Sequence, residues 1–107
     1  MTADELAVET RRLVDRVSTW TPPRWAASTA SGAGTRADRF FTLIQEIADA
    51  AAEAEGQPRR EVPRLAPDTA LPDQLRVVVA DLIEAAPDDE TRLAVAAKRV
   101  LTTKRAL

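Results

Sequence analysis

The segment Leu71–Ala86, LPDQLRVVVADLIEAA, carries the clearest structural pattern in the chain. On a helical wheel its apolar residues fall within an arc of about 140°, the width of a stripe that faces a protein core. The run Val77–Val79 also suits a strand, because β-branched residues favour sheets. However, one helical period continues through all sixteen residues, and strands seldom exceed about ten. We therefore expect a helix around which the others pack. Its apolar stripe consists of Leu71, Leu75, Val78, Val79, Leu82, Ile83 and Ala86.

The N-terminal segment has the same period and leads to two prolines. Thr2 and Glu5 have the spacing of a capping box, in which side chains bond unpaired backbone amides of the first helical turn. Apolar residues then recur on one face as far as Trp20. Proline cannot donate to the helical hydrogen-bond pattern, and the residue before it avoids the α conformation. We therefore expect Pro22–Pro23 to end the first helix by Thr21.

Two further segments complete a set of four helices. The range from about Arg36 to Glu55 has a wide apolar face, begins with a capping-box spacing at Thr35 and Asp38, and is followed by Gly56. The C-terminal segment has an apolar face as well, and Asp88 is placed to cap its first turn. Both segments are therefore expected to be amphipathic helices.

The connections between these helices differ in character. Residues 26–35, AASTASGAGT, have the small and polar composition of a flexible linker. Residues 57–70, QPRREVPRLAPDTA, are too rich in proline for regular structure, although Val62 and Leu65 can hold them against the helices. The short break around Pro87 predicts an antiparallel hairpin of the last two helices. The resulting prediction is an all-α fold, with residues 1–107 as a single domain: a compact four-helix bundle with two long irregular connections.

Composition excludes several classes of protein. The chain of 107 residues has no cysteine and no histidine, which excludes thiolate chemistry and the commonest general base. The net charge of −2 gives no overall attraction for nucleic acids or anionic membranes. The sequence has neither an apolar run long enough to cross a membrane nor the pattern of a signal peptide. We therefore expect a cytoplasmic protein.

No residue pattern predicts catalysis, a cofactor or a metal. The acidic run Asp88–Glu90 lacks the spacing of a calcium loop, and capping of a helix explains it. Asp38, Glu46, Asp49 and Glu53 form the polar face of the second helix, without the histidines that carboxylate-bridged metal sites require. No phosphate-binding loop or nucleophile elbow is present. The protein is therefore expected not to be an enzyme.

Basic residues gather in the proline-rich connection and near the C-terminus. If folding brings the two groups together, they form an anion-binding patch; otherwise each is a solvated group or a partner for the acidic second helix. The residues of this candidate patch are Arg59, Arg60, Arg64, Lys98, Arg99, Lys104 and Arg105. The patch is the basis of one functional alternative, a protein that associates with nucleic acid.

The sequence Trp20–Trp25, WTPPRW, is the main candidate for a partner-binding site. Tryptophan and arginine are the residues most enriched at binding hot spots, which singles out Trp20, Arg24 and Trp25. The alternative is that Trp20 lies in the core and that Trp25 folds back as a lid over the bundle. We expect Trp25 to be partly buried, with one ring face accessible.

Self-association is a further expectation. Val8, Val77 and Val95 each lie on the otherwise polar face of a helix, and the alanine-rich core leaves a reason to bury more surface in a homodimer. The favoured function is a helical protein-interaction module or accessory subunit without catalytic activity.

Overall fold

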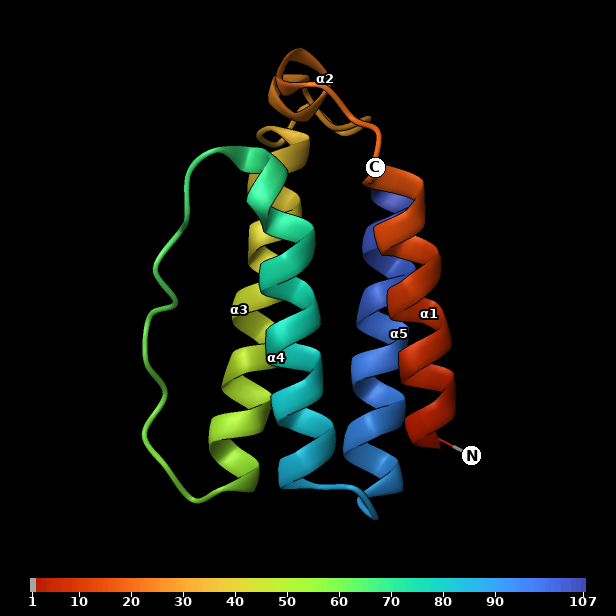
Figure 1. The fold of residues 1–107 in the computed structure, drawn as a ribbon, viewed down its shortest axis with the longest axis vertical. Helices are drawn as coiled ribbons and strands as arrows, with labels where there is room; N and C mark the ends of the chain where they lie inside the picture. The colour runs from red at the N-terminus through yellow and green to blue at the C-terminus, as the bar shows by residue number, and fades with distance from the viewer. Residues whose placement is uncertain (1) are drawn as a thin grey trace.

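Four long helices account for most of the computed structural model, which describes residues 2–107, with side chains from residue 3 onward (Figure 1). They are α1 (Thr2–Val17), α3 (Arg36–Ala54), α4 (Leu71–Ala85) and α5 (Glu90–Ala106). A short helix, α2 (Pro22–Ala26), and a 3₁₀ turn, η1 (Asp68–Ala70), complete the elements of this range. Within it an isolated bridge between Ser28 and Thr35 is the only extended pairing. The expected all-α fold is confirmed.

The short helix α2 is a correction to the expected helix count. Pro22 and Pro23 do not simply end the preceding helix, because α1 has already ended at Val17. They occupy the first two positions of α2, where a proline needs no amide hydrogen and its fixed φ suits a helix. The two prolines, which are expected from the sequence to end the first helix, therefore begin α2.

The ends of α3 follow the sequence closely. The Thr35 hydroxyl accepts from the Asp38 amide at 3.0 Å, and the Asp38 carboxylate accepts from the Thr35 amide at 3.3 Å, which forms the expected capping box. At the other end Gly56 has a φ of 68°, a left-handed conformation that suits glycine. Its amide donates to Glu53 and the next amide, of Gln57, donates to Ala52, which is the Schellman pattern.

The start of α5 differs from the prediction by one residue. Asp89, not Asp88, is the capping residue, and its side chain accepts from the Arg92 amide at 3.0 Å. The helix starts later because the turn after Ala86 includes Asp88, whose carbonyl accepts from the Glu90 amide. The capping box expected at Thr2 involves a side chain outside the described part.

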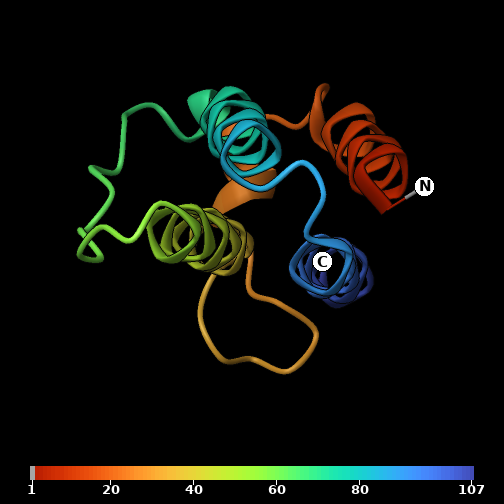
Figure 2. The same cartoon turned by 90° about the horizontal axis from the view of Figure 1, so that it is seen from below.

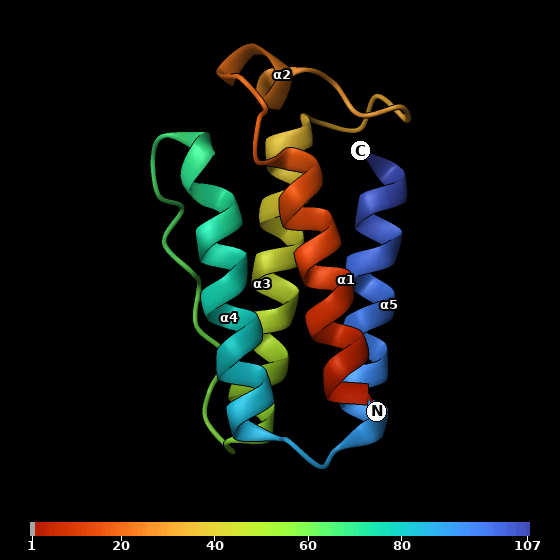
Figure 3. The same cartoon turned by 45° about the vertical axis from the view of Figure 1, so that its right-hand side comes forward.

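The long helices form two parallel pairs. In Figures 1 and 3, α1 and α5 run in one direction and α3 and α4 run in the opposite direction. The closest packing is within these pairs, with α1 against α5 and α3 against α4. The view along the helices in Figure 2 shows α4 and α5 at opposite corners of the group. The last two helices, α4 and α5, are therefore antiparallel, as expected. However, α4 packs most closely on α3, and α5 packs most closely on α1.

One hydrophobic cluster joins all four long helices. Its largest fully buried side chains include Leu13 of α1, Phe40 of α3, Leu75 of α4 and Leu93 of α5. The apolar stripe of α4 lies in this cluster, apart from Ile83, which is half-buried, and Ala86, which lies just past the helix end. The residues that the helical period placed inside are therefore the ones that pack together.

Residues 26–35, which are expected to be a flexible linker, form a hydrogen-bonded turn in the structure, and their flexibility stays a prediction. The Thr29 amide donates to the Gly34 carbonyl at 3.1 Å, and the Arg36 amide donates to the Ala27 carbonyl at 2.9 Å. Together with the Ser28–Thr35 bridge, these bonds close the segment into a turn that leads into α3 (Figure 3). The small and polar composition gives no sign of these backbone hydrogen bonds, so the sequence indicates only a flexible linker.

The connection at residues 57–70 is extended and mostly irregular, as predicted, apart from η1. Figure 1 shows it passing outside α3 and α4 and returning the chain to the end where α4 begins. Val62 packs against the core cluster, as expected. Leu65 does not, because 52% of it remains exposed. This long return is what allows α3 and α4 to be parallel neighbours.

Candidate functional site

The predicted aromatic binding site is part of the core. Trp25 is only 1% exposed, so the expectation that one of its ring faces is accessible is wrong. Its ring packs edge-to-face against Trp20, with centroids 4.9 Å apart, and against Phe40, with centroids 5.2 Å apart. Helix α2 lies over the end of the fold where α3 and α4 begin, in contact with α3 and η1 (Figure 1), and its Trp25 belongs to the core cluster. The lid interpretation of this segment is the correct one.

Two arginines, Arg24 and Arg36, lie over the ring of Trp20. The guanidinium groups of Arg24 and Arg36 lie 4.9 and 5.3 Å from the centroid of its ring. The Arg36 side chain also donates to the Arg24 carbonyl at 3.4 Å, which ties α2 to the start of α3. Because Trp20 is itself only 6% exposed, the Trp20–Trp25 segment offers a partner the edge of Arg24 and little aromatic surface.

The candidate anion patch is divided by ion pairs. Arg59 pairs with Glu53 and Arg99 pairs with Glu46, both on α3. Hydrogen bonding from Arg59, and next its charge, holds the pKa of Glu53 below its usual value. Arg59 and Arg99, two residues of the candidate patch, thus pair with carboxylates of α3. This is the second of the two arrangements that the sequence left open.

Arg64 is also paired, but with the cap of α3. Its guanidinium lies 2.7 Å from the Asp38 carboxylate and 3.4 Å from that of Asp68. Hydrogen bonding from Arg64, followed by the bond from the Thr35 amide, lowers the pKa of Asp38. One carboxylate therefore closes the capping box and holds the connection against the helix.

A groove of about 520 Å³ lies between α3 and α5. Arg92 crosses it, contacting Glu53 at 3.4 Å, Asp89 at 3.2 Å and the Ala50 carbonyl at 3.3 Å. Val95 lies on its wall and is 49% exposed. The charged groups of this groove are mostly paired with one another, so it presents little unmatched charge to a ligand.

The opposite side of α5 is different. Between α1 and α5 a groove of about 530 Å³ has small and apolar side chains along its floor and charged residues along its edges. The floor consists of Val8, Ala94, Ala97 and Leu101. We call this groove and its charged surroundings the α1–α5 face. Its charged residues are Asp4, Glu5, Glu9, Arg12, Arg16, Glu90, Lys98 and Arg105.

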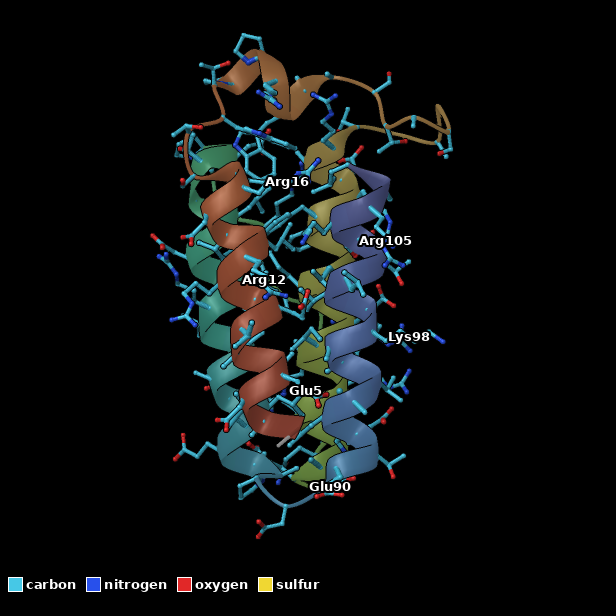
Figure 4. The ribbon with its side chains drawn as sticks, turned by 90° about the vertical axis from the view of Figure 1, so that its right-hand side faces the viewer. Glu5, Arg12, Arg16, Glu90, Lys98 and Arg105 are labelled. Carbon is cyan, nitrogen blue, oxygen red and sulfur yellow. The ribbon has the colours of Figure 1, made fainter. Side chains whose placement is uncertain are left out.

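Charge on the α1–α5 face is separated by sign. Figure 4 shows Glu5 and Glu90 at one end, Arg12 and Lys98 further along, and Arg16 and Arg105 towards the other end. Each helix follows the usual preference for acids in its first turn and bases in its last, which complements the helix dipole. Since α1 and α5 are parallel, these preferences add instead of cancelling. The face is therefore negative at one end and positive at the other.

Most of these charges have no ion-pair partner within the part of the chain that the structure describes. Arg12 pairs with Glu9 at 2.8 Å. Among the described side chains, no ion pair involves the exposed residues at the two ends of the face, which are Glu5, Glu90, Arg16 and Arg105. The charges that define the polarity of the face are thus available to another molecule.

Sequence reasoning missed this face for a definite reason. Lys98 and Arg105 were assigned to an anion patch with the arginines of the connection, which lies on the far side of α3 and α4. The charge order along each helix was visible, but the parallel placement of α1 beside α5 was not. That placement follows from the long connection, and helical periodicity does not specify it.

No cluster of metal-ligating side chains is found among the described residues 3–107. Within that range no three or more carboxylates gather as metal ligands. Its buried polar side chains are the threonines Thr10, Thr29 and Thr103. None of the described helices is both long and apolar enough to cross a bilayer. Comparisons with protein-family models, with curated proteins and with solved structures find no match to the chain.

Proposed function

We propose that this protein is a non-catalytic interaction module, in which a four-helix bundle of α1, α3, α4 and α5 presents the α1–α5 face to a protein partner. The observation that carries this proposal is the separation of charge along that face, with Glu5 and Glu90 at one end and Arg16 and Arg105 at the other. An apolar floor with a charged rim is the usual composition of a protein-binding surface. A cytoplasmic location stays a prediction.

A protein surface fits this face better than a nucleic acid does. Phosphates are attracted by continuous positive charge, and acidic residues repel them. Half of the α1–α5 face is acidic, and Arg59, Arg64 and Arg99 are occupied by carboxylates elsewhere. A partner with charges of both signs, arranged in the opposite order, matches the whole face.

Affinity capture with the full chain tests the proposal. The wild-type protein is expected to retain a partner that is lost when the acidic end is reversed by Glu5→Arg and Glu90→Arg. The matched control is Glu55→Arg with Glu84→Arg, which makes the same change of charge at the exposed capping residue after α3 and at an exposed position of α4. A captured protein must then bind the purified chain directly. A partner that is retained equally by all three proteins contradicts the assignment of this face.

Titration with nonspecific duplex DNA tests the alternative function. We expect no binding at physiological salt. Binding that weakens steeply as salt is added, and that is lost on Arg60→Glu with Arg105→Glu, would favour a nucleic-acid-associated protein that uses the basic connection and the basic C-terminus.

A further inference from the structure

We infer that the α1–α5 face binds a second copy of this chain, arranged so that the helices of one copy run antiparallel to the same helices of the other. This inference rests on the proposed function of the face and names its partner. It follows from a property of the charge pattern: a surface that is negative at one end and positive at the other is complementary to itself once it is turned end over end.

Two simple two-fold arrangements place this face against itself, and they differ in charge. With the axis along the helices, the Glu5 end of one copy meets the Glu5 end of the other, and like charges repel. With the axis across the helices, the end with Glu5 and Glu90 meets the end with Arg16 and Arg105. Charge therefore selects the second arrangement, in which α1 faces α1 and α5 faces α5, both antiparallel.

The floor of the face suits close approach of two helical surfaces. Ala94 and Ala97 have small side chains, and Val8 and Leu101 are half-buried apolar residues whose remaining surface is covered only by a partner. In an isologous contact the same patch of both copies meets, so each of these residues contributes to the interface once from each copy. The apolar floor favours association, while the charges at the ends determine the orientation of the two copies.

This contact differs from the self-association that the sequence suggested. Of the three valines proposed from the helical wheel, only Val8 lies on the α1–α5 face. Val77 is 59% exposed on α4, and Val95 lies in the groove on the other side of α5. The dimer that we propose leaves both of them exposed.

The decisive experiment uses two variants with opposite changes and measures mass by sedimentation velocity. One variant carries Glu5→Arg and Glu90→Arg, so that both ends of its face are positive. The other carries Arg16→Glu and Arg105→Glu, so that both ends are negative. The wild type is expected to be a dimer at low salt and to dissociate as salt rises. Each variant alone is expected to dimerise at least about tenfold more weakly, and an equimolar mixture to recover the dimer.

Recovery in the mixture separates charge pairing from a general loss of structure, because a misfolded variant cannot be rescued by its opposite. Circular dichroism of each variant confirms that it is folded, and the Glu55→Arg and Glu84→Arg control is expected to dimerise as the wild type does. If charge reversal in the first turns of α1 and α5 prevents folding, Glu5→Gln and Glu90→Gln replace it, with weaker dimers expected.

A monomeric wild type, a mixture that stays monomeric, or variants that dimerise normally would each overturn the inference. A monomer that still captures another protein through Glu5 and Glu90 would leave the proposed function standing without the dimer.

Discussion

Gln45 on α3 and Gln74 on α4 hold the extended connection in the same way. The Gln45 amide group donates to the Arg60 carbonyl at 2.9 Å and accepts from the Val62 amide at 2.8 Å. A primary amide has both a donor and an acceptor, so it can pair with a backbone as a neighbouring strand would. The Gln45 side chain therefore supplies the two hydrogen bonds to the backbone of the connection that a neighbouring β-strand would otherwise supply.

Gln74 repeats this pairing a few residues further along the connection. Its amide donates to the Pro63 carbonyl at 2.8 Å and accepts from the Leu65 amide at 3.3 Å. The two glutamines belong to neighbouring parallel helices, α3 and α4, and the connection passes outside both of these helices (Figure 1). These four hydrogen bonds hold the connection to α3 and α4, in addition to the ion pairs of Arg59 and Arg64 and the packing of Val62.

Replacing Gln45 is expected to loosen the connection without unfolding the helices. Gln45→Ala removes both hydrogen bonds to the backbone, and we expect a loss of about 1 kcal/mol in the free energy of unfolding. The chain after Arg59 and Arg60 should become easier to cleave with trypsin. Time courses of limited proteolysis and urea denaturation measure the two effects.

Gln57→Ala is the matched control for this prediction. Gln57 lies at the start of the same connection, is exposed and makes no side-chain hydrogen bond to the described residues. Its replacement should change neither measurement. Equal cleavage rates for the Gln45 and Gln57 variants would show that the glutamine pairing does not restrain the connection.

The cap of α5 gives a second prediction. Asp89→Ala should lower the melting temperature, because the Arg92 amide loses its acceptor at 3.0 Å and the Arg92 guanidinium loses one at 3.2 Å. Asp89→Ser keeps a capping hydroxyl but not the ion pair, so we expect an intermediate value. Asp88→Ala is the control and should melt as the wild type does. A larger fall in melting temperature for Asp88→Ala than for Asp89→Ala would contradict this assignment and favour Asp88 as the capping residue, as the sequence predicts.

Asp38 gives a prediction about pH. Its pKa is lowered in the fold, first by hydrogen bonding from Arg64 and then by the Thr35 amide. A carboxylate with a lowered pKa stabilises the fold above its unfolded pKa of about 3.9, and this contribution is lost as the pH falls through the folded value. Wild-type stability should therefore fall more steeply below about pH 4 than that of Asp38→Asn. Urea midpoints measured from neutral to acidic pH compare the two, and parallel curves would contradict the assignment.

The four long helices could be predicted from sequence because their signals are local. Helical period, the Thr35 capping box and the left-handed Gly56 each depend on a few neighbouring residues. The buried residues followed from the same period, as α4 shows. Local physics was sufficient for these features because each helix needed only one apolar face.

The features that sequence reasoning missed depend on distant residues. Gln45 and Gln74 lie on polar helix faces, where periodicity treats every side chain as solvated, and their partners are 15 and 11 residues away, respectively. The polarity of the α1–α5 face requires two parallel helices from opposite ends of the chain. Neither relationship has a local signal that helical periodicity or motif spacing could detect.

Trp25 shows how a correct local rule can lead to the wrong functional residue. The two prolines before it were interpreted as the end of helical order, which left the ring without a predicted position. In the structure they begin α2, which turns Trp25 inward against Trp20 and Phe40. The hot-spot composition of the segment reflects core packing, since large aromatic rings serve equally well in cores and in interfaces.

Trp25→Ala is therefore expected to destabilise the fold strongly. Removing a fully buried tryptophan leaves a cavity between α2 and α3, and such truncations cost about 3–5 kcal/mol. Trp25→Phe should cost less because a smaller ring still fills part of the space. Arg24→Ala is the comparison variant, because it keeps the Trp25 ring and removes only the guanidinium over Trp20, at an expected cost of about 1 kcal/mol or less. Urea denaturation compares the three variants, and a Trp25→Ala protein as stable as the Arg24→Ala protein would mean that the ring does not support the core.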